Sequence, residues 1–133
     1  PGLSKSGAKS EAMVELIDIY PTLTDLAGLK GPGHLQGSSL RPLLGNPERL
    51  GNKKYAYSVV TRGPKNFGYA LRNQNWRYSK WPDGEELYNL NNDPEEKKNL
   101  VSFPHVAERL AEFRTFLARK QEQAADRIHP QTQ

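Results

Sequence analysis

Side chains that could bind a metal ion are densest in residues 86–100, which read ELYNLNNDPEEKKNL. Asparagine amides and carboxylates are oxygen ligands of the kind that Ca²⁺ prefers. A calcium loop, however, needs acidic side chains at alternating positions, a central glycine and a bidentate glutamate at its end. This segment has neither that spacing nor a glycine. The sequence therefore favours a structural turn, in which Asp93 is a helix N-cap, Pro94 takes the first helical position and Glu96 completes a capping box.

The remaining residues with catalytic potential form no recognisable set. The histidines His34, His105 and His129 have no second histidine or carboxylate at ligand spacing, and there is no cysteine. No serine lies in a nucleophile-elbow motif, and no glycine-rich phosphate loop is present. We predict no catalytic residue, no metal site and no bound cofactor in this chain. His34, in a glycine-rich loop, is kept as a pocket candidate, whereas His105 and His129 are predicted to be surface residues.

Positive charge is concentrated in residues 49–82, which contain no Asp or Glu. The basic residues of this block are Arg49, Lys53, Lys54, Arg62, Lys65, Arg72, Arg77 and Lys80. Such a block suits an anionic partner, namely nucleic acid, a sulfated glycan or an acidic substrate. A solvated basic face is the structural alternative.

Within this block, Arg62 and Lys65 lie in the loop TRGPKN, and loops on a rigid scaffold often carry binding groups. Arginine offers a planar fork that matches a carboxylate or a sulfate. We therefore predict that Arg62 and Lys65 bind substrate, and we add Lys80 and Trp81 as further candidates. The other two strand arginines, Arg72 and Arg77, are predicted to be structural, stacked on aromatic rings or paired with Glu85 or Glu86.

The elements that position these residues begin with a predicted antiparallel sheet of about four strands. Short segments rich in aromatic and β-branched residues, bounded by turn signals, cover 54–60, 67–73, 76–81 and 85–90. Residues 73–75 and 82–84 are suited to tight hairpin turns. Strand alternation places Trp76, Tyr78 and Lys80 on one face of the third strand and Arg77, Ser79 and Trp81 on the other.

A helix is predicted over about residues 103–127, with Ser102 as its cap and Pro104 in its first turn. Its apolar stripe consists of Val106, Leu110, Phe113 and Leu117, with Ala107 and Ala111 beside them. The helix should lie across the sheet, which makes the predicted fold class α+β. Residues 129–133 are expected to be a frayed tail.

The N-terminal part predicts a strand and a helix. The apolar pattern of residues 13–29 is helical, but Pro21 cannot lie inside a helix without losing a hydrogen bond. We therefore expect a short strand near 13–17, then a helix over 19–27 with Asp18 as N-cap and Gly28 at its C-terminal end. The following loop, 30–53, is predicted to hold one helical turn capped by Ser38 or Ser39.

The composition predicts a small core. The chain has 133 residues, of which 35% are hydrophobic, and its mean hydropathy is −0.81. No apolar run approaches the roughly 20 residues that span a bilayer, so no membrane span is expected. The chain starts at Pro1 and its only methionine is Met13, from which we expect a fragment or a processed chain.

Several of these segments, in this order, resemble the C-terminal part of the type I sulfatases, a branch of the alkaline-phosphatase-like superfamily. They are VELIDIYPTLTDLAGL, LQGSSLRPLL, GYALRNQNWRYSKW and ELYNLNNDPEEKKNL, and the resemblance covers residues 1 to about 117. The combination of YAYSVVTRG with GYALRNQNWRYSKW is most similar to the iduronate-2-sulfatase group and its bacterial relatives.

The resemblance implies a parent enzyme that hydrolyses sulfate esters, of a sulfated sugar or uronate, with a formylglycine nucleophile and a bound Ca²⁺. Neither group is expected on this chain. The motif that forms formylglycine is missing from it, and the resemblance implies that the nucleophile and the calcium ligands belong to the N-terminal part of the parent enzyme. The chain alone is therefore expected to be inactive, with the N-terminal catalytic region of the same sulfatase as its partner. Export to the periplasm, the exterior or a lysosome-like compartment is expected from the family.

The resemblance also implies a domain organisation. Residues 1–45 would be an edge strand, helix and linker of the large α/β domain, and residues 46–128 the C-terminal antiparallel-sheet subdomain. Loops of that subdomain overhang the catalytic pocket in relatives, which agrees with the charge argument for Arg62 and Lys65.

Two alternatives stay open on the sequence alone. The basic block is interleaved with the aromatic residues Tyr55, Tyr57, Phe67, Tyr69, Trp76 and Tyr78. Such a pattern is typical of a stand-alone module that binds polyanions, either single-stranded nucleic acid or sulfated glycan, although nucleic acid is the less expected partner. The same alternation fits the core face of a sheet, in which case the chain would be a structural fragment without substrate contacts.

Overall fold

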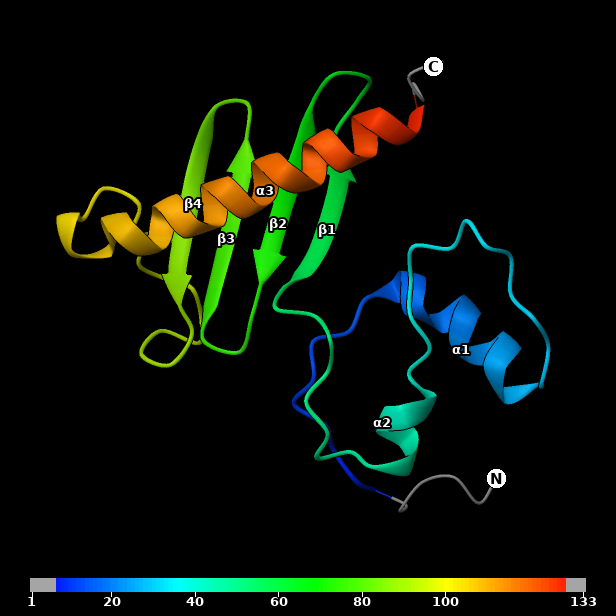
Figure 1. Cartoon of the computed structure of the whole chain (residues 1–133). Coiled ribbons are helices and arrows are strands. Elements are labelled where there is room, and N and C mark those ends of the chain that lie inside the picture. The colour runs from blue at the N-terminus through cyan, green and yellow to red at the C-terminus, as the bar shows by residue number, and fades with distance from the viewer. Residues whose placement is uncertain (1–6, 129–133) are drawn as a thin grey trace. The chain divides into compact units, whose positions relative to one another are not determined.

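The computed structural model describes residues 7–128, and divides the chain into two compact units, residues 1–56 and 57–133. The predicted tail at 129–133, with His129, lies outside the described residues. The first unit holds a 3-10 turn at Leu16–Asp18 followed by α1 (Ile19–Leu26) and α2 (Arg41–Gly45) (Figure 1). The sequence analysis placed the boundary between the two parts earlier, at residues 45 and 46.

The second unit contains a four-stranded antiparallel sheet in the order β1-β2-β3-β4, as predicted. Its strands are β1 (Ala56–Thr61), β2 (Phe67–Arg72), β3 (Trp76–Trp81) and β4 (Gly84–Asn89), each within a few residues of the predicted bounds. The turn from β2 to β3 is closed by Asn73, whose side-chain oxygen accepts hydrogen bonds from the N–H groups of Asn75 and Trp76 at 3.0 and 2.8 Å. Register pairs Leu71 with Tyr78, and Tyr78 with Leu87, so that these side chains share one face.

The helix α3 (Ala107–Ile128), preceded by a 3-10 turn at Pro104–Val106, crosses that face of the sheet (Figure 1). The predicted stripe is confirmed, because Val106, Leu110, Phe113 and Leu117 are all buried. The Phe113 ring lies 5.7 Å from the ring of Tyr78, centroid to centroid. Ala107 and Ala111 are exposed, so the stripe is narrower than predicted. Ser102 is not the cap, since Phe103 occupies that position without a side-chain hydrogen bond.

A polar cluster closes one side of this core. The Tyr78 hydroxyl donates to Glu85 Oε1 at 2.8 Å, and Arg114 Nε donates to Glu85 Oε2 at 3.0 Å. The hydrogen bond from Arg114 holds the pKa of Glu85 below its usual range, while burial raises the pKa of Tyr78. Tyr78 therefore stays protonated and Glu85 ionised over the neutral range, which keeps this buried hydroxyl satisfied.

The first unit is built around one buried carboxylate, that of Asp18, which is 0% exposed. It accepts hydrogen bonds from the backbone N–H groups of Glu15 and Ser38, both at 2.8 Å. It also accepts from the Lys53 ammonium, at 2.7 and 2.8 Å. Because these donors come from distant parts of the sequence, the carboxylate ties three segments of the unit together.

The predicted strand at 13–17 is wrong. Residues 16–18 form the 3-10 turn, in which the Asp18 carboxylate accepts the N–H of Glu15. A strand needs a neighbour for its backbone groups, and no strand precedes β1 in the described residues. The helix that follows is confirmed at Ile19–Leu26, with Gly28 at φ 70° just beyond its end.

The segment 36–40 is held to α1 by its backbone. The Leu40 N–H donates to Thr22 Oγ1 at 2.8 Å, and Gly37 lies so close to the Ile17 carbonyl that a Cβ at position 37 would collide with it. Ser39 donates its hydroxyl to Asp25 at 2.6 Å. The predicted serine cap is wrong, because α2 has Leu40 as its N-cap and no side-chain cap.

Asp93 organises a turn, as predicted, but no helix begins there. Its two carboxylate oxygens accept the N–H groups of Lys97 and Lys98 at 3.0 and 2.8 Å. Glu96 cannot complete a capping box, because it has a left-handed backbone conformation, with φ 57°, and its carboxylate pairs with Arg77. A helical residue at that position would need a negative φ.

Candidate functional site

The loop that follows β1 presents Arg62 in a defined position. The Arg62 N–H donates to the Asn66 carbonyl at 2.8 Å, and the Thr61 hydroxyl donates to the Gly63 carbonyl at 2.6 Å. Gly63 has φ 89°, a conformation that favours glycine. These contacts close the loop tightly, so that the Arg62 backbone is fixed although its side chain is exposed.

The Arg62 guanidinium stacks on Trp81, the last residue of β3. Its central carbon lies 4.5 Å from the centroid of the indole ring. Such a contact is worth about 0.5–1 kcal/mol at an exposed site. Among the described residues no carboxylate is paired with Arg62, so its planar set of N–H donors can receive an anion.

The Trp81 ring in turn rests against the backbone of β2. A Cβ added at Gly68 would lie 2.5 Å from two carbons of the indole, so the ring occupies the space of the missing side chain. Gly68 is buried beneath it. The three residues thus form a stack, which we call the Arg62–Trp81 stack, with Gly68 at its base.

Replacing Gly68 with alanine is expected to displace the Trp81 ring and, with it, the Arg62 guanidinium. A contact of 2.5 Å cannot be accommodated without a shift of the ring. In the full-length protein we expect the Gly68→Ala variant to raise KM for an anionic substrate by up to roughly tenfold, because it displaces the Arg62 guanidinium without removing it. The measurement is KM, with Gly84→Ala as a matched strand control because a Cβ there meets nothing. Equal KM values for both glycine variants would contradict the stack.

Of the other predicted substrate-binding residues, Lys80 is not brought to this stack. Lys80 precedes Trp81 in β3 and therefore points to the opposite face, where it is paired in register with Tyr69 and Glu85. Lys65 is exposed in the Arg62 loop. His34 is exposed in the loop between α1 and α2 of the first unit.

The strand arginines differ in part from the prediction. Arg77 is structural, but it pairs with Glu96 and not with Glu85 or Glu86. The Glu85 carboxylate instead accepts hydrogen bonds from Tyr78 and Arg114. The sequence did not show this, because Glu96 was predicted to complete a capping box with Asp93 and not to return to β3.

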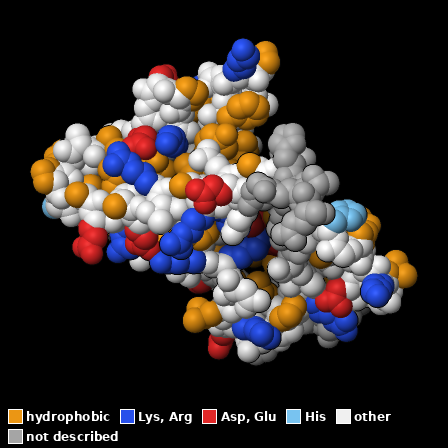
Figure 2. Space-filling model, turned by 45° about the horizontal axis from the view of Figure 1, so that its top comes forward, with side chains coloured by type: hydrophobic (Ala, Val, Ile, Leu, Met, Phe, Trp, Pro, Cys, Tyr) orange, Lys and Arg blue, Asp and Glu red, His pale blue; other side chains and the backbone are white. Residues whose placement is uncertain are grey.

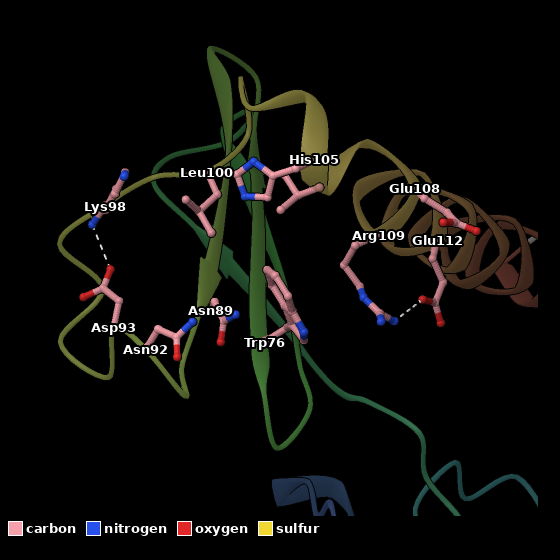
Figure 3. A pocket seen from close by; sticks show the side chains of 11 residues that line it. Trp76, Asn89, Asn92, Asp93, Lys98, Leu100, His105, Glu108, Arg109 and Glu112 are labelled. Atoms are coloured by element: carbon pink, nitrogen blue, oxygen red, sulfur yellow. Dashed lines mark hydrogen bonds and ion pairs between the residues drawn. The ribbon is translucent and has the colours of Figure 1, made fainter.

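The structure also shows a cavity that the sequence analysis missed (Figure 3). It has a volume of about 880 Å³ and lies in the second unit, between the segment after β4 and the start of α3. Trp76 and His105 line it, although His105 was predicted only as a surface residue. Two asparagines of the ELYNLNNDP segment, Asn89 and Asn92, are the signal that could have indicated it.

The aromatic residues of the basic block do not form an open platform. Tyr78 is fully buried under α3, and Tyr57 and Tyr69 stack on each other with centroids 6.5 Å apart. Lys and Arg side chains on the face drawn in Figure 2 have Asp and Glu side chains among them. The alternation of aromatic residues thus largely reflects the core face of the sheet.

Comparison with known proteins identifies the family to which this architecture belongs. Residues 1–123 match the family model described as N-sulphoglucosamine sulphohydrolase, C-terminal. The chain belongs to this sulfatase C-terminal family. The resemblance seen in the sequence is therefore confirmed.

Relatives of this sulfatase C-terminal domain include two curated sulfatases. Human Arylsulfatase K is 34% identical over an alignment of 118 residues, which covers 80% of this chain and 22% of that protein. The Delta 4,5-hexuronate-2-O-sulfatase of Bacteroides thetaiotaomicron is 35% identical over an alignment of 110 residues, which covers 76% of this chain and 22% of that protein. The chain thus spans less than a quarter of the length of either relative.

Solved structures share the fold of the domain. BT4656, in complex with its substrate D-glucosamine-2-N, 6-O-disulfate, superposes with a TM-score of 0.85 at 27% identity, over 100% of this chain and 29% of that one. BT1596, a 2-O GAG sulfatase, gives a TM-score of 0.73 at 31% identity, over 86% of this chain and 26% of that one.

Proposed function

We propose that this chain is the C-terminal part of a sulfatase that hydrolyses sulfate esters of a sulfated sugar. In this proposal the chain completes the fold and lines the substrate pocket, and it does not supply the nucleophile. The family and the names of the two curated relatives support the reaction class. Export of the whole protein is part of the same proposal and rests on the family alone.

The observation that carries the substrate-binding role is the Arg62–Trp81 stack. The Arg62 guanidinium is held over the aromatic ring, and its N–H groups lie in its own plane, where a sulfate or carboxylate can accept two of them. Lys65, on the same loop, would supply a second positive charge. A sulfated uronate carries two anionic groups, which suits such a pair. Lys80, which points to the opposite face of the sheet, has no part in this arrangement.

The chemical groups of the family's reaction would come from residues outside this chain. Within the described residues there is no group of three or more His, Cys, Asp or Glu that could hold a metal ion. The chain also lacks cysteine, one of the two precursors of formylglycine, and has no motif for forming it from serine. We propose that the calcium ion and the formylglycine are held by the rest of the enzyme, while this chain's residues bind and orient the substrate.

The first unit supports a large partner within the same protein. Apolar side chains of the 3-10 turn, of α1 and of the residues just after it are exposed, with Leu16 at 85%, Leu23 at 61% and Leu29 at 65%. Several large apolar side chains exposed within so short a segment are typical of an interface. We propose that the rest of the sulfatase, which makes up more than three quarters of the length of the curated relatives, covers these side chains.

None of the described helices is long and apolar enough to cross a membrane.

The experiment compares Arg62→Ala with Arg62→Lys in the full-length protein. Substrates are a sulfated uronide disaccharide and an aryl sulfate, which lacks the carboxylate. For the uronide we expect Arg62→Ala to raise KM by about 10- to 100-fold with a smaller loss of kcat, since a charge-assisted hydrogen bond is worth roughly 1.5–3 kcal/mol. The Arg62→Lys variant should be intermediate, because it keeps the charge and loses the fork.

The matched control is Arg119→Ala, which removes an exposed arginine of α3 far along the chain from the stack. It should leave KM and kcat unchanged. Unchanged parameters in Arg62→Ala would remove Arg62 from the pocket. Failure of the full-length protein to release sulfate from either substrate would overturn the proposed activity itself.

A further inference from the structure

The cavity of the second unit lies at a corner of the sheet beside the start of α3 (Figure 3). Trp76, at the start of β3, is half-buried and presents its ring to the cavity. Trp76 is paired in register with Asn89, at the end of β4, so both side chains stand on the α3 side of the sheet. The volume of about 880 Å³ falls within the range of roughly 300–1,000 Å³ that small-molecule sites occupy.

The charged groups around this cavity are partly engaged by contacts within the protein. The Arg109 guanidinium lies 5.8 Å from the Trp76 ring centroid and donates to Glu112 at 2.6 Å. The Lys98 ammonium lies 5.0 Å from the Phe103 ring, and the Lys98 backbone N–H donates to Asp93 at 2.8 Å. With Glu108 also on the wall, acidic groups balance or exceed basic ones. A sulfate or phosphate would meet these carboxylates and be repelled.

Two amides remain available for hydrogen bonding. Asn89 uses its oxygen to accept the N–H of Asn91 at 3.1 Å, which leaves its NH₂ group to donate. The Asn92 side chain makes no hydrogen bond within the described residues, although it lines the cavity. An amide offers two donors and an acceptor side by side, which matches a ligand whose hydroxyl groups both donate and accept.

We propose that this cavity binds an uncharged saccharide unit, separately from the Arg62–Trp81 stack. A pyranose ring has an apolar C–H face, which would lie on the Trp76 indole, and a rim of hydroxyls, which would reach Asn89, Asn92 and Glu112. A nucleotide could stack on the same ring, but its phosphates would face the carboxylates. The proposal goes beyond sulfate release, because it gives the small domain a way to hold an unsulfated stretch of a glycan.

The test uses the full-length protein and N-acetylchitotetraose, an uncharged tetrasaccharide, with binding measured by saturation-transfer NMR and calorimetry. We expect millimolar affinity with little dependence on salt, because no ion pair forms. Trp76→Ala should weaken binding at least tenfold, and Asn92→Ala about threefold or more. Trp76→Phe, which keeps an aromatic surface and guards against a folding defect, should retain part of the affinity.

Asn91→Ala is the matched control, since Asn91 is the exposed neighbour of Asn92 and does not line the cavity. It should bind the tetrasaccharide like the unaltered protein. Absence of binding, equal losses in Asn91→Ala and Asn92→Ala, or displacement of the neutral sugar from this cavity by a heparin tetrasaccharide would each overturn the proposal. Because the readout is binding of an unsulfated sugar, its failure is distinguishable from a failure of the sulfatase proposal.

Discussion

Substitution of Asp18 by alanine is expected to lower the free energy of unfolding of the first unit by about 3–5 kcal/mol. The carboxylate is fully buried and is the shared acceptor for two backbone N–H groups and the Lys53 ammonium. Its removal leaves the ammonium with Glu15 as its remaining carboxylate partner, and it leaves both N–H groups without an acceptor. Hydrogen exchange of amides 16–40 in the full-length protein measures the effect.

The control for Asp18→Ala is Asp25→Ala, in the same helix region. Asp25 pairs with Arg41 at 3.0 Å, but the two side chains are 39% and 48% exposed. An exposed pair contributes about 0–1 kcal/mol, so this variant should change little. Equal protection in both variants would contradict a central role for the Asp18 carboxylate.

The ion pair between Asp18 and Lys53 predicts a pH dependence for the stability of the first unit. Burial alone would raise the pKa of Asp18, but hydrogen bonds from Lys53, Ser38 and Glu15 outweigh it and hold the pKa below its usual value. This stabilisation is present above the unfolded pKa of about 3.9 and is lost as pH falls through the lower folded value. The pKa of Lys53 is raised despite its burial. The stabilisation that the charged Lys53 contributes is therefore lost only as pH rises through a value above the 10.5 of a free lysine. Protection of amides 16–40 should be flat near neutrality and fall in acid, and the acid loss should be smaller in Asp18→Ala.

Substitution of Phe113 by alanine is the second large effect, at about 3–5 kcal/mol in the second unit. The ring is 0% exposed and packs between α3 and the sheet against Tyr78. The cavity it leaves cannot close easily, because the sheet register fixes the Leu71, Tyr78 and Leu87 side chains beneath it. Hydrogen exchange of the β2, β3 and β4 amides measures the loss.

Phe103→Ala provides the comparison for Phe113→Ala. This substitution removes the same side chain, but Phe103 precedes α3 and is 36% exposed. Its replacement should cost no more than about 1–2 kcal/mol, in proportion to the smaller area removed from water. A loss as large as that of Phe113→Ala would show that the core does not lie where the structure places it.

The sheet and α3 were predictable because their signals are local. Strand alternation and turn residues fix where β2, β3 and β4 begin and end, and the spacing of Val106, Leu110, Phe113 and Leu117 fixes the buried face of the helix. The strand at 13–17 was not predictable in this way. A short apolar run is compatible with both a strand and a turn. The turn is selected by hydrogen bonds to Asp18 from Ser38 and Lys53, which are 20 and 35 residues away in the chain.

The candidate site shows the same division. The residue types of Arg62 and Trp81 and their place in a basic block are readable in the sequence, and so is the order of motifs that marks the sulfatase C-terminal family. Strand pairing across the sheet decides how these side chains are arranged. It places the Trp81 ring on Gly68, under the Arg62 guanidinium, and it points Lys80 to the other face. It also brings Trp76 to the same cavity as Asn89 and Asn92. Local propensity and periodicity act over a few residues, so the sequence determined the elements. Contacts between residues far apart in the chain exist only after folding, and they alone decided which side chains meet.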